Sequence, residues 1–466
     1  RSSHRVKRTL FLLTTGLLFA ACTFAAKPPN VVLIISDDQS WTDYSFMEHE
    51  AIETPNIDRL ARQSRLFKRG YVPTSLCCPS LASIITGLYP HQHGITGNEP
   101  PIPSGGKNTD QYRSQVQECV GFIDTVPTLP RLLAKRGYVS HQSGKWWQGH
   151  YSRGGFTHGM THGDPKRRGR HGDVGLKIGR EGLQPIFDFI DDAGDKPFFI
   201  TVGIHKPHVP FIAPQKYFNL YPKNRLQFEL NPVNDWNDIP KMAMVKRFSG
   251  FGFELGEEND PLRREYTQAY HACVSFVDAQ IGLILDKLKE QKLWDDTIVI
   301  FTSDHGYHLG EHFMWGKVTL FEECARVPLV VRVPGVSNPG TRSEGLVETI
   351  DLFPTLAELC KLVAPAHLQG GSYAGLIREP SGEGKPSAYT VVSRGNQLGR
   401  SIRTRRWRYA EWGAAEAAEL YDLERDPREY TNLAKSSKHR AVLNRMKDTL
   451  TKRRKQAGSA GNPTRK

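Results

Sequence analysis

The segment Asn30-Val-Val-Leu-Ile-Ile-Ser36, with the Asp37-Asp38 pair that follows it, decides how this chain folds. Its apolar residues run continuously, without the polar alternation of a half-buried strand, and Pro29 precedes them. A short apolar run with such boundaries is typical of a strand that is covered on both faces. The segment therefore predicts the central strand of a mostly parallel sheet.

Two further apolar runs also end in residues that can do chemistry. Residues 197–202 lead into His205-Lys-Pro-His208, and residues 297–302 lead into Asp304-His305. Between them, residues 266–288 carry apolar side chains at helical spacing. This alternation predicts an α/β fold with a large, mixed but mostly parallel central sheet flanked by helices. Because ligands of open α/β sheets bind outside the carboxyl ends of the strands, we expect one shared site there.

The C-terminal part of the chain follows a different pattern. Residues 363–384 are rich in Gly, Pro and Ser and predict a connection, whereas the alternation in 389–393 and 400–409 predicts a small antiparallel sheet. A terminal helix is expected over about 438–453. The expected organisation is a catalytic domain over residues 27–365, a C-terminal subdomain over 366–455 and a disordered basic tail over 456–466.

The first residues have the pattern of a secretory leader. Basic Arg5-Val-Lys-Arg8 precedes an apolar run, Leu10 to Ala21, and small residues follow. The run is too short for a convincing membrane span. Cys22 after two alanines also resembles a lipoprotein attachment site, but soluble export is the preferred interpretation. We therefore expect residues 1–26 to be a signal peptide and the protein to be secreted or periplasmic, without a membrane span.

Composition excludes several classes of protein. A chain of 466 residues with 38% hydrophobic residues is too long for a peptide module and long enough to bury a large core. The formal charge of +13 falls to +3 once the ten basic residues of the leader and of the tail after Leu450 are left out, so nucleic acid is not an expected partner. The cysteines beyond the leader show no CxxC pair and predict no disulfide framework.

The acidic residues at the strand ends suggest a metal site. A single Asp there is most often a helix N-cap, but Asp37 and Asp38 would repel each other without a cation. With Asp304, three carboxylates suit Ca²⁺ or Mg²⁺. A His305 ligand leaves Zn²⁺ and Mn²⁺ open.

The segment Ser75-Leu-Cys77-Cys-Pro79-Ser80-Leu81-Ala-Ser-Ile-Ile-Thr86-Gly87 is the most specific motif. It places Cys77 before a predicted helix, where backbone N–H groups favour an anion, and Pro79 in the first turn. The segment resembles the C-x-P-S-x-x-x-x-x-T-G signature of type I sulfatases, which are members of the alkaline phosphatase superfamily.

The resemblance continues in family order along nearly the whole mature chain. Two of the matching segments are 205–210 and 303–306, and in them His205–His208 and Ser303–Gly306 look most like the iduronate-sulfatase members. The others are Leu88–Gly94, Ser143–Trp146, Gly310–Lys317, Val327–Leu329, Leu420–Leu423 and Asp426–Pro427.

The resemblance implies an alkaline-phosphatase-like fold and a set of residue roles. Cys77 would be oxidised by a maturation enzyme to Cα-formylglycine (3-oxoalanine), whose hydrate supplies the nucleophile beside the metal. The implied metal ligands are Asp37, Asp38, Cys77, Asp304 and His305. The implied catalytic residues are Cys77, Lys145, His208 and Lys317, and the expected substrate-binding residues are His150, His205, His312 and Trp147.

Most of these residues have a plain structural alternative when each is taken singly. Lys145 resembles a surface lysine with a buried stem, His205 or His208 could cap a turn, and His312 could be a core histidine. The basic stretch 166–171 is equally a solvated loop or the wall of an anionic sugar cleft. Their occurrence together in family order favours the functional interpretation.

Two positions depart from the family pattern. Leu81 stands where the family usually has an Arg that assists maturation and holds the formylglycine diol. His150 is the nearest substitute for a His that the family often has just after the Gly-Lys pair. The Leu81 replacement puts the conversion of Cys77 in question.

The sequence therefore predicts an exported, metal-dependent sulfatase that acts on sulfate esters, with a sulfated carbohydrate as the expected substrate. A phosphodiester or phosphonate hydrolase of the same superfamily is the first alternative, since the anions are nearly isosteric. A catalytically silent glycan-binding relative, which kept the fold after losing the Arg at position 81, is the second.

Overall fold

The computed structural model describes residues 27–145, 149–160, 183–228, 231–245, 261–336, 338–394 and 397–459. The predicted leader (1–26), Trp147 and the basic stretch 166–171 lie outside the described residues. Among the helices of these described ranges, none combines the length and the apolar character that crossing a membrane requires.

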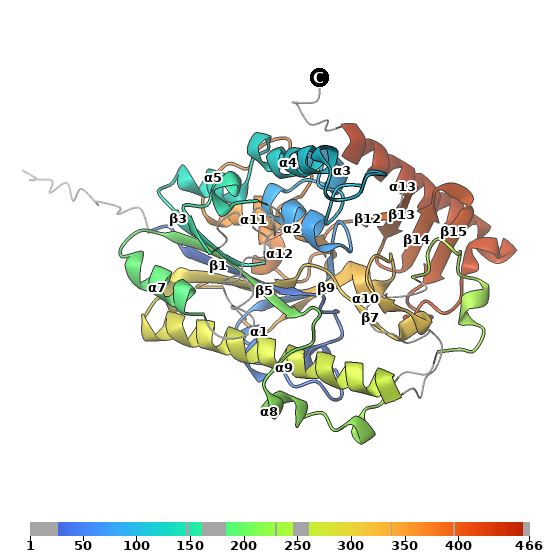
Figure 1. Ribbon diagram of the computed structural model, residues 1–466, viewed down its shortest axis with the longest axis horizontal. Helices are drawn as coiled ribbons and strands as arrows, with labels where there is room; N and C mark the ends of the chain where they lie inside the picture. The colour runs from blue at the N-terminus through green and yellow to red at the C-terminus, as the bar shows by residue number, and fades with distance from the viewer. Residues whose placement is uncertain are drawn as a thin grey trace, which may run out of the picture.

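A nine-stranded mixed sheet forms the centre of the molecule, in the order β10-β2-β9-β6-β1-β5-β3-β4, with β11 paired to β2 (Figure 1). Strand β9 runs antiparallel to both of its neighbours, and the other pairings are parallel. The strands are β1 Asn30–Asp37, β2 Arg65–Tyr71, β3 Val139–Gly144, β4 His158–Gly159, β5 Phe198–Pro207, β6 Thr297–Ser303, β9 Arg326–Arg332, β10 Arg342–Ser343 and β11 Val347–Glu348. The predicted mixed, mostly parallel sheet is confirmed, with β1 inside it.

Strand β1 shows why the apolar run has no polar alternation. Successive side chains of a strand point to opposite faces, and both faces of this sheet are covered. Val31, Leu33 and Ile35 enter the core on one face, whereas Val32 and Ile34 enter the core on the other. All eight residues of β1 are buried.

Helices cover both faces of the sheet (Figure 1). One face packs against α2 Cys77–Thr86, α5 Leu129–Ala134 and α11 Leu352–Leu359. The other packs against α1 Pro55–Ala61, α7 Gln184–Asp192 and α9 Pro261–Glu290, and the last of these contains the predicted helix 266–288. Other helices are α3 Pro90–His93, α4 Asp110–Thr125, α8 Gln215–Phe218, α10 Glu322–Ala325 and α12 Ala374–Arg378. Helix α12 lies inside the stretch that was predicted to be only a connection.

A second, four-stranded antiparallel sheet follows in the C-terminal part, as predicted. It consists of β12 Ala388–Arg394, β13 Gln397–Arg403, β14 Trp407–Trp412 and β15 Ala414–Asp422. The predicted alternating run 400–409 is therefore divided between two strands. Helix α13, Arg440–Ser459, packs on this sheet through Met446 and Leu450, and it continues four residues into the tail that was expected to be disordered.

A buried ionic network joins α13 to the large sheet. The Glu348 carboxylate, which is fully buried, accepts hydrogen bonds from Tyr89 (2.8 Å) and Arg453 (3.0 Å) and also pairs with Lys385. Arg453 in turn donates to the Tyr89 hydroxyl at 2.9 Å. Because a buried carboxylate is costly without charged partners, Arg453 fixes where the helix docks.

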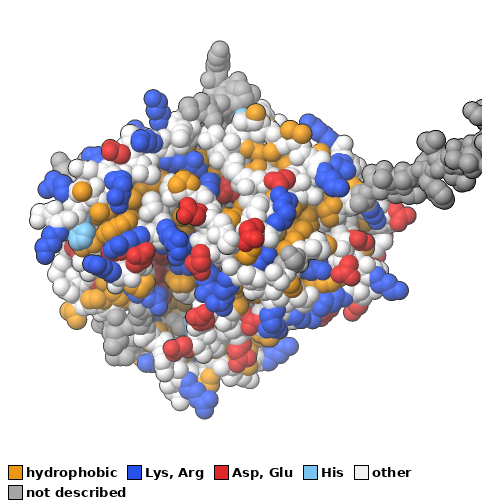
Figure 2. Space-filling model, turned by 180° about the vertical axis from the view of Figure 1, so that it is seen from behind, with side chains coloured by type: hydrophobic (Ala, Val, Ile, Leu, Met, Phe, Trp, Pro, Cys, Tyr) orange, Lys and Arg blue, Asp and Glu red, His pale blue; other side chains and the backbone are white. Residues whose placement is uncertain are grey.

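Acidic and basic side chains are interspersed on the face opposite to that of Figure 1, rather than gathered by sign (Figure 2). Such mixing gives this face no extended field of one sign.

We predict that Arg453→Met lowers the free energy of unfolding by about 2–3 kcal/mol, because the buried Glu348 carboxylate loses one of its cationic partners. Chemical denaturation of the full chain measures the change. The neighbouring Arg454 is exposed, so Arg454→Met is the matched control and should change stability by less than about 0.5 kcal/mol. Equal effects of the two substitutions would contradict the role of Arg453.

Candidate active site

The carboxyl ends of β1, β5 and β6 meet at one edge of the central sheet. In the register of the sheet, Ser36 pairs with Ser303 of β6 and Asp37 pairs with Pro207 of β5. This register brings together three segments that are remote in sequence: Asp37-Asp38, His205–His208 and Asp304-His305. The sequence-based expectation of one shared site at the strand ends agrees with this arrangement.

Cys77 is the first residue of α2 and points toward this edge from the opposite side. Pro79 lies in the first turn, and Ser80 Oγ donates to the Asp304 carbonyl at 2.5 Å, which ties the helix to the end of β6. The Cys78 amide donates to Asn98 Oδ1 at 2.9 Å. Cys77 is fully buried, and the helix N-terminus behind it favours an anion.

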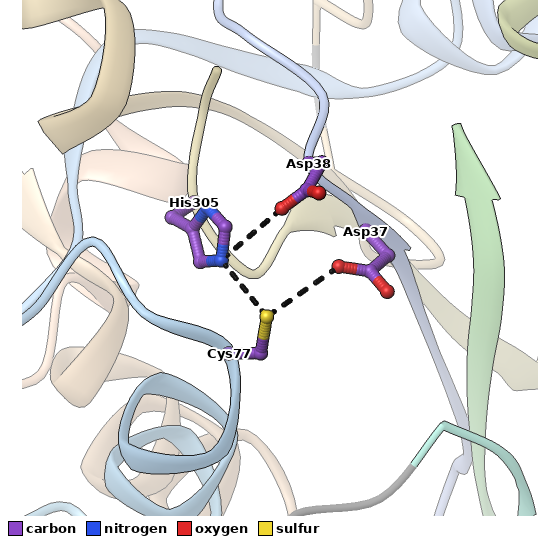
Figure 3. Close-up of side chains that lie close together, drawn as sticks. All are labelled: Asp37, Asp38, Cys77 and His305. Carbon is purple, nitrogen blue, oxygen red and sulfur yellow. Dashed lines mark hydrogen bonds and ion pairs between the residues drawn. The ribbon is translucent and has the colours of Figure 1, made fainter. Parts of the chain in front are cut away.

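Asp37, Asp38 and His305 converge near the Cys77 sulfur (Figure 3). Cys77 Sγ lies 3.8 Å from Asp37 Oδ1 and 3.3 Å from His305 Nε2. His305 Nε2 is also 3.5 Å from Asp38 Oδ1. One donor atom from each of these four residues lies within 4.8 Å of the others, and all four residues are buried.

Asp37, Asp38, Cys77 and His305 are residue types that bind cations, and two of their carboxylate oxygens lack a hydrogen-bond partner. Asp37 Oδ2 and Asp38 Oδ2 are buried and accept no hydrogen bond from the described residues. Buried carboxylate oxygens of this kind require a cation or a donor. Asp304, the fifth predicted ligand, borders the group, with Oδ1 3.6 Å from His305 Nε2.

Two buried lysines supply positive charge beside the sulfur. Lys317 Nζ lies 2.9 Å from Cys77 Sγ and 2.7 Å from Asp38 Oδ1. Lys145 Nζ pairs with Asp37 and lies 3.2 Å from Asp304 Oδ2. The alternative of a surface lysine does not hold for Lys145, whose side chain is 2% exposed.

Gly203 allows the Lys145 segment to approach. The Lys145 amide donates to the Gly203 carbonyl at 2.6 Å, and a Cβ on residue 203 would overlap the Lys145 backbone. The residue type at this point of β5 therefore determines where the Lys145 ammonium is placed.

The lysines also control the protonation of their neighbours. Burial alone would raise the pKa of Cys77, but Lys145 and Lys317 outweigh it and hold this pKa well below that of a free thiol. Burial would likewise raise the pKa of Asp37, and Lys145 and the other nearby cations lower it well below its ordinary value. The site therefore favours an anion at residue 77.

His205 and His208 stand on the β5 side of the site, with ring centroids 4.8 Å apart. His205 Nδ1 is 3.4 Å from Asp37 Oδ2, and His208 Nε2 is 3.7 Å from Asp38 Oδ2. His208 Nδ1 donates to the Val209 carbonyl at 2.6 Å, which leaves Nε2 to face the site. Burial lowers the pKa of His208 to about 3 despite the opposing charge of Asp37, so its ring is neutral.

The other predicted substrate-binding residues are placed differently. His150 caps a short 3-10 helix, Tyr151–Gly154, where its Nδ1 contacts the Ser152 hydroxyl at 2.8 Å. His312 is fully buried, and its contacts are with Asp235 and Phe321 rather than with Cys77. Leu81, at the departure from the family pattern, lies in α2 and packs into the hydrophobic core on that face of the sheet.

Tyr270 is a site residue that the sequence analysis missed. Its hydroxyl donates to the Asp38 carbonyl at 2.7 Å and contacts Asp43 Oδ2 at 2.5 Å. Asp38 has a left-handed backbone (φ 65°), a conformation that non-glycine residues adopt only when their surroundings impose it. A tyrosine on the buried face of α9 was the only signal in the sequence, and it does not reveal a partner at residue 38.

Comparison with known proteins agrees with the geometry. The family model described as Sulfatase matches residues 29–362, which is more than half of the chain. A second model, described as N-sulphoglucosamine sulphohydrolase, C-terminal, matches residues 310–456.

Individual proteins are similar along most of the chain. A sulfatase of Formosa agariphila is 29% identical, with 96% of this chain and 92% of that protein aligned. Iduronate 2-sulfatase of Mus musculus is 26% identical over 90% of this chain and 93% of its own length.

Among solved structures, a protein in complex with its substrate D-glucosamine-2-N,6-O-disulfate superimposes with a TM-score of 0.74. It is 22% identical and covers 94% of this chain and 100% of its own, which establishes a shared fold. Because the Sulfatase model spans the strand ends, Cys77 and both lysines, the chain belongs to the sulfatase family and is a sulfuric ester hydrolase.

Proposed function

We propose that this protein is an exported, metal-dependent sulfatase that releases sulfate from a carbohydrate by way of a formylglycine made from Cys77. The observation that carries the proposal is the position of Cys77, at a helix N-terminus between Lys317 and the Asp37, Asp38 and His305 donor atoms. Export rests on the leader pattern of residues 1–26.

The residues present fit a divalent cation. Asp37, Asp38, Asp304 and His305 would hold it together with residue 77, and the predominance of carboxylate oxygens favours Ca²⁺ or Mg²⁺. When bound, such an ion would polarise the sulfate and lower the pKa of a hydroxyl on the formylglycine hydrate. The unsatisfied Oδ2 atoms of Asp37 and Asp38 support this assignment.

Lys145 and Lys317 bring permanent positive charge to the position where sulfate would bind. Both ammonium groups are buried, and nearby carboxylates raise their pKa values above that of a free lysine. In a site shielded from water, preorganised cations of this kind stabilise the charge that develops on the sulfate oxygens as the S–O bond breaks.

His208 is suited to move a proton at the leaving oxygen. Its Nδ1–H is held by the Val209 carbonyl, so Nε2 is the atom that can accept and return a proton. Although the ring is neutral beside the two lysines, an anionic sulfate next to it would favour the protonated form. Protonation matters most for a sugar alkoxide, which is a poor leaving group.

Leu81 bears on the maturation of Cys77. The Arg that the family usually has at this position is absent, and the positive charge near residue 77 comes from Lys145 and Lys317, which match cations of the family pattern in their own right. These lysines hold the pKa of Cys77 well below that of a free thiol without any contribution from position 81, so the site around residue 77 keeps its positive charge despite Leu81.

A sulfated carbohydrate is the proposed substrate class. Iduronate 2-sulfatase and an N-acetylglucosamine-6-O-sulfatase are among the relatives, at 26% and 25% identity. Their names concern those proteins, and they support the same class of substrate here.

We predict that peptide mass spectrometry of protein from a host with a maturation enzyme detects the aldehyde at residue 77, and that Cys77→Ala abolishes turnover while the thermal midpoint changes little. The same enzyme should hydrolyse sulfate esters faster than phosphate diesters or phosphonates. Retained activity of the alanine variant would refute the nucleophile. A higher rate on phosphonates would favour the alternative hydrolase, and an intact thiol without any turnover would favour the silent binder.

We predict that Asp38→Asn removes the active-site ion and lowers kcat by at least about 10³-fold, because one carboxylate ligand is lost. Elemental analysis and steady-state kinetics of the same preparation measure both effects. Asp58→Asn is the control, since Asp58 lies in α1, outside the donor group. Unchanged metal content in the Asp38 variant would remove this residue from the ligand set.

We predict that His208→Gln lowers kcat on a sugar sulfate by about 10²–10⁴-fold, and by much less on 4-nitrophenyl sulfate, whose leaving group needs no proton. Comparing kcat for the two substrates in one preparation isolates the leaving-group effect. Equal losses on both substrates would place the role of His208 away from the leaving oxygen.

A further inference from the structure

A second buried cluster of ligand-type side chains lies outside the site around Cys77. One nitrogen of His312 and one carboxylate oxygen from each of Glu323 and Glu429 lie within 4.8 Å of one another. The three residues are 0%, 4% and 1% exposed. They come from the 3-10 helix Glu311–Phe313, from α10 and from the turn after β15, so the cluster joins the catalytic part of the chain to its C-terminal sheet.

His312 has the orientation of a metal ligand. Its Nδ1 is 3.0 Å from Asp235 Oδ2, and its ring packs against Phe321 with centroids 4.2 Å apart. Metal-binding histidines typically direct their second ring nitrogen to a carboxylate in this way. The remaining nitrogen, Nε2, is buried and has no hydrogen-bond partner among the described residues.

The backbone also holds His312 in place. Its amide donates to Asn231 Oδ1 at 3.0 Å, and its carbonyl accepts from the Trp236 indole. Residue 312 has a left-handed conformation (φ 54°), which is unfavourable for a non-glycine residue. The surroundings therefore impose this position on the imidazole.

Glu323 has a buried carboxylate oxygen, Oε2, without a hydrogen-bond partner among the described residues. Its carboxylate forms no ion pair and no side-chain hydrogen bond with the described residues, and Oε2 is fully buried. Burial raises the pKa of Glu323 to about 8, with Glu429 adding to this shift and His312 and Arg428 opposing it. Glu323 and His312 form no direct hydrogen bond in the described structure. Their donor atoms nevertheless lie within 4.8 Å of each other, and this gap between them is the candidate position for an ion.

Glu429 anchors the other side of this space. One oxygen pairs with Arg408, and the other accepts the Glu322 amide at 3.0 Å. Arg408 Nη2 also lies 3.9 Å from Glu419. The single positive charge of Arg408 is therefore divided between Glu419 and Glu429 and does not neutralise Glu323 as well.

We propose that His312 Nε2, Glu323 and Glu429 form a second, buried metal site for a first-row divalent ion such as Zn²⁺ or Mn²⁺. One imidazole with two carboxylates suits these ions, whereas Ca²⁺ and Mg²⁺ prefer oxygen ligands alone. The ion satisfies the unpartnered Nε2 and neutralises Glu323. It acts structurally, as a cross-link between α10 and the C-terminal sheet, and it is independent of the reaction at Cys77.

Metal content of the folded full-length protein tests this site. After loading with Zn²⁺ or Mn²⁺ and removal of free metal, elemental analysis should find one transition-metal ion per wild-type chain. Glu323→Gln keeps the side-chain shape and should lose that ion while retaining the alkaline-earth ion of the active site. Asp38→Asn should show the reverse pattern. A wild-type chain that takes up no transition metal, or a Glu323→Gln variant that retains it fully, overturns the proposal.

Thermal stability separates a metal ion from a proton. Zn²⁺ added to chelator-treated wild-type protein should raise its thermal midpoint and should leave that of Glu323→Gln unchanged. If Glu323 is instead simply protonated, neither midpoint responds to Zn²⁺, which refutes the site. Should the variant fail to fold, anomalous diffraction from wild-type crystals grown with Zn²⁺ decides: a peak between His312 and Glu323 is expected, and its absence overturns the proposal.

Discussion

The burial of three carboxylates at the ends of two adjacent parallel strands is the constraint on which the site depends. Asp37 ends β1, Asp38 follows it, and Asp304 follows β6, all of them shielded from water. Like charges so close together in a low-dielectric interior are tolerated only with cations or hydrogen-bond donors around them. Lys145 and Lys317 supply part of that charge, and a divalent ion fits the oxygens that remain unsatisfied.

The lysines depend in turn on distant parts of the chain. Lys145 reaches the carboxylates because β5 has a glycine where the two backbones approach most closely. The loop that carries Lys317 is held from both sides, by the Val318 amide on the Ser75 carbonyl at 3.2 Å and by an Arg394 guanidinium on the Val318 carbonyl. Because Arg394 ends β12, the C-terminal sheet helps to position a cation at Cys77.

This dependence gives a physical account of Leu81. In this chain the helix that begins at Cys77 presents an apolar side chain to the core at position 81, so it contributes no charge of its own near residue 77. Positive charge instead arrives through tertiary contacts, from Lys317 at 2.9 Å from the sulfur and from Lys145 beside Asp37. The positive charge around residue 77 therefore comes from the ends of two other segments of the described chain.

The sequence by itself determined the layered α/β architecture, the central place of residues 30–36 and the meeting of the strand ends. These follow from local rules, because continuous apolar runs need two covered faces and parallel strands align their carboxyl ends. Only the tertiary structure decided which polar residues meet. It separated His312 from Cys77, placed Tyr270 under Asp38 and carried α13 to Ser459 by docking it through Arg453. Such pairings join residues that are 77 to 232 positions apart, and no local propensity encodes a partner at that distance.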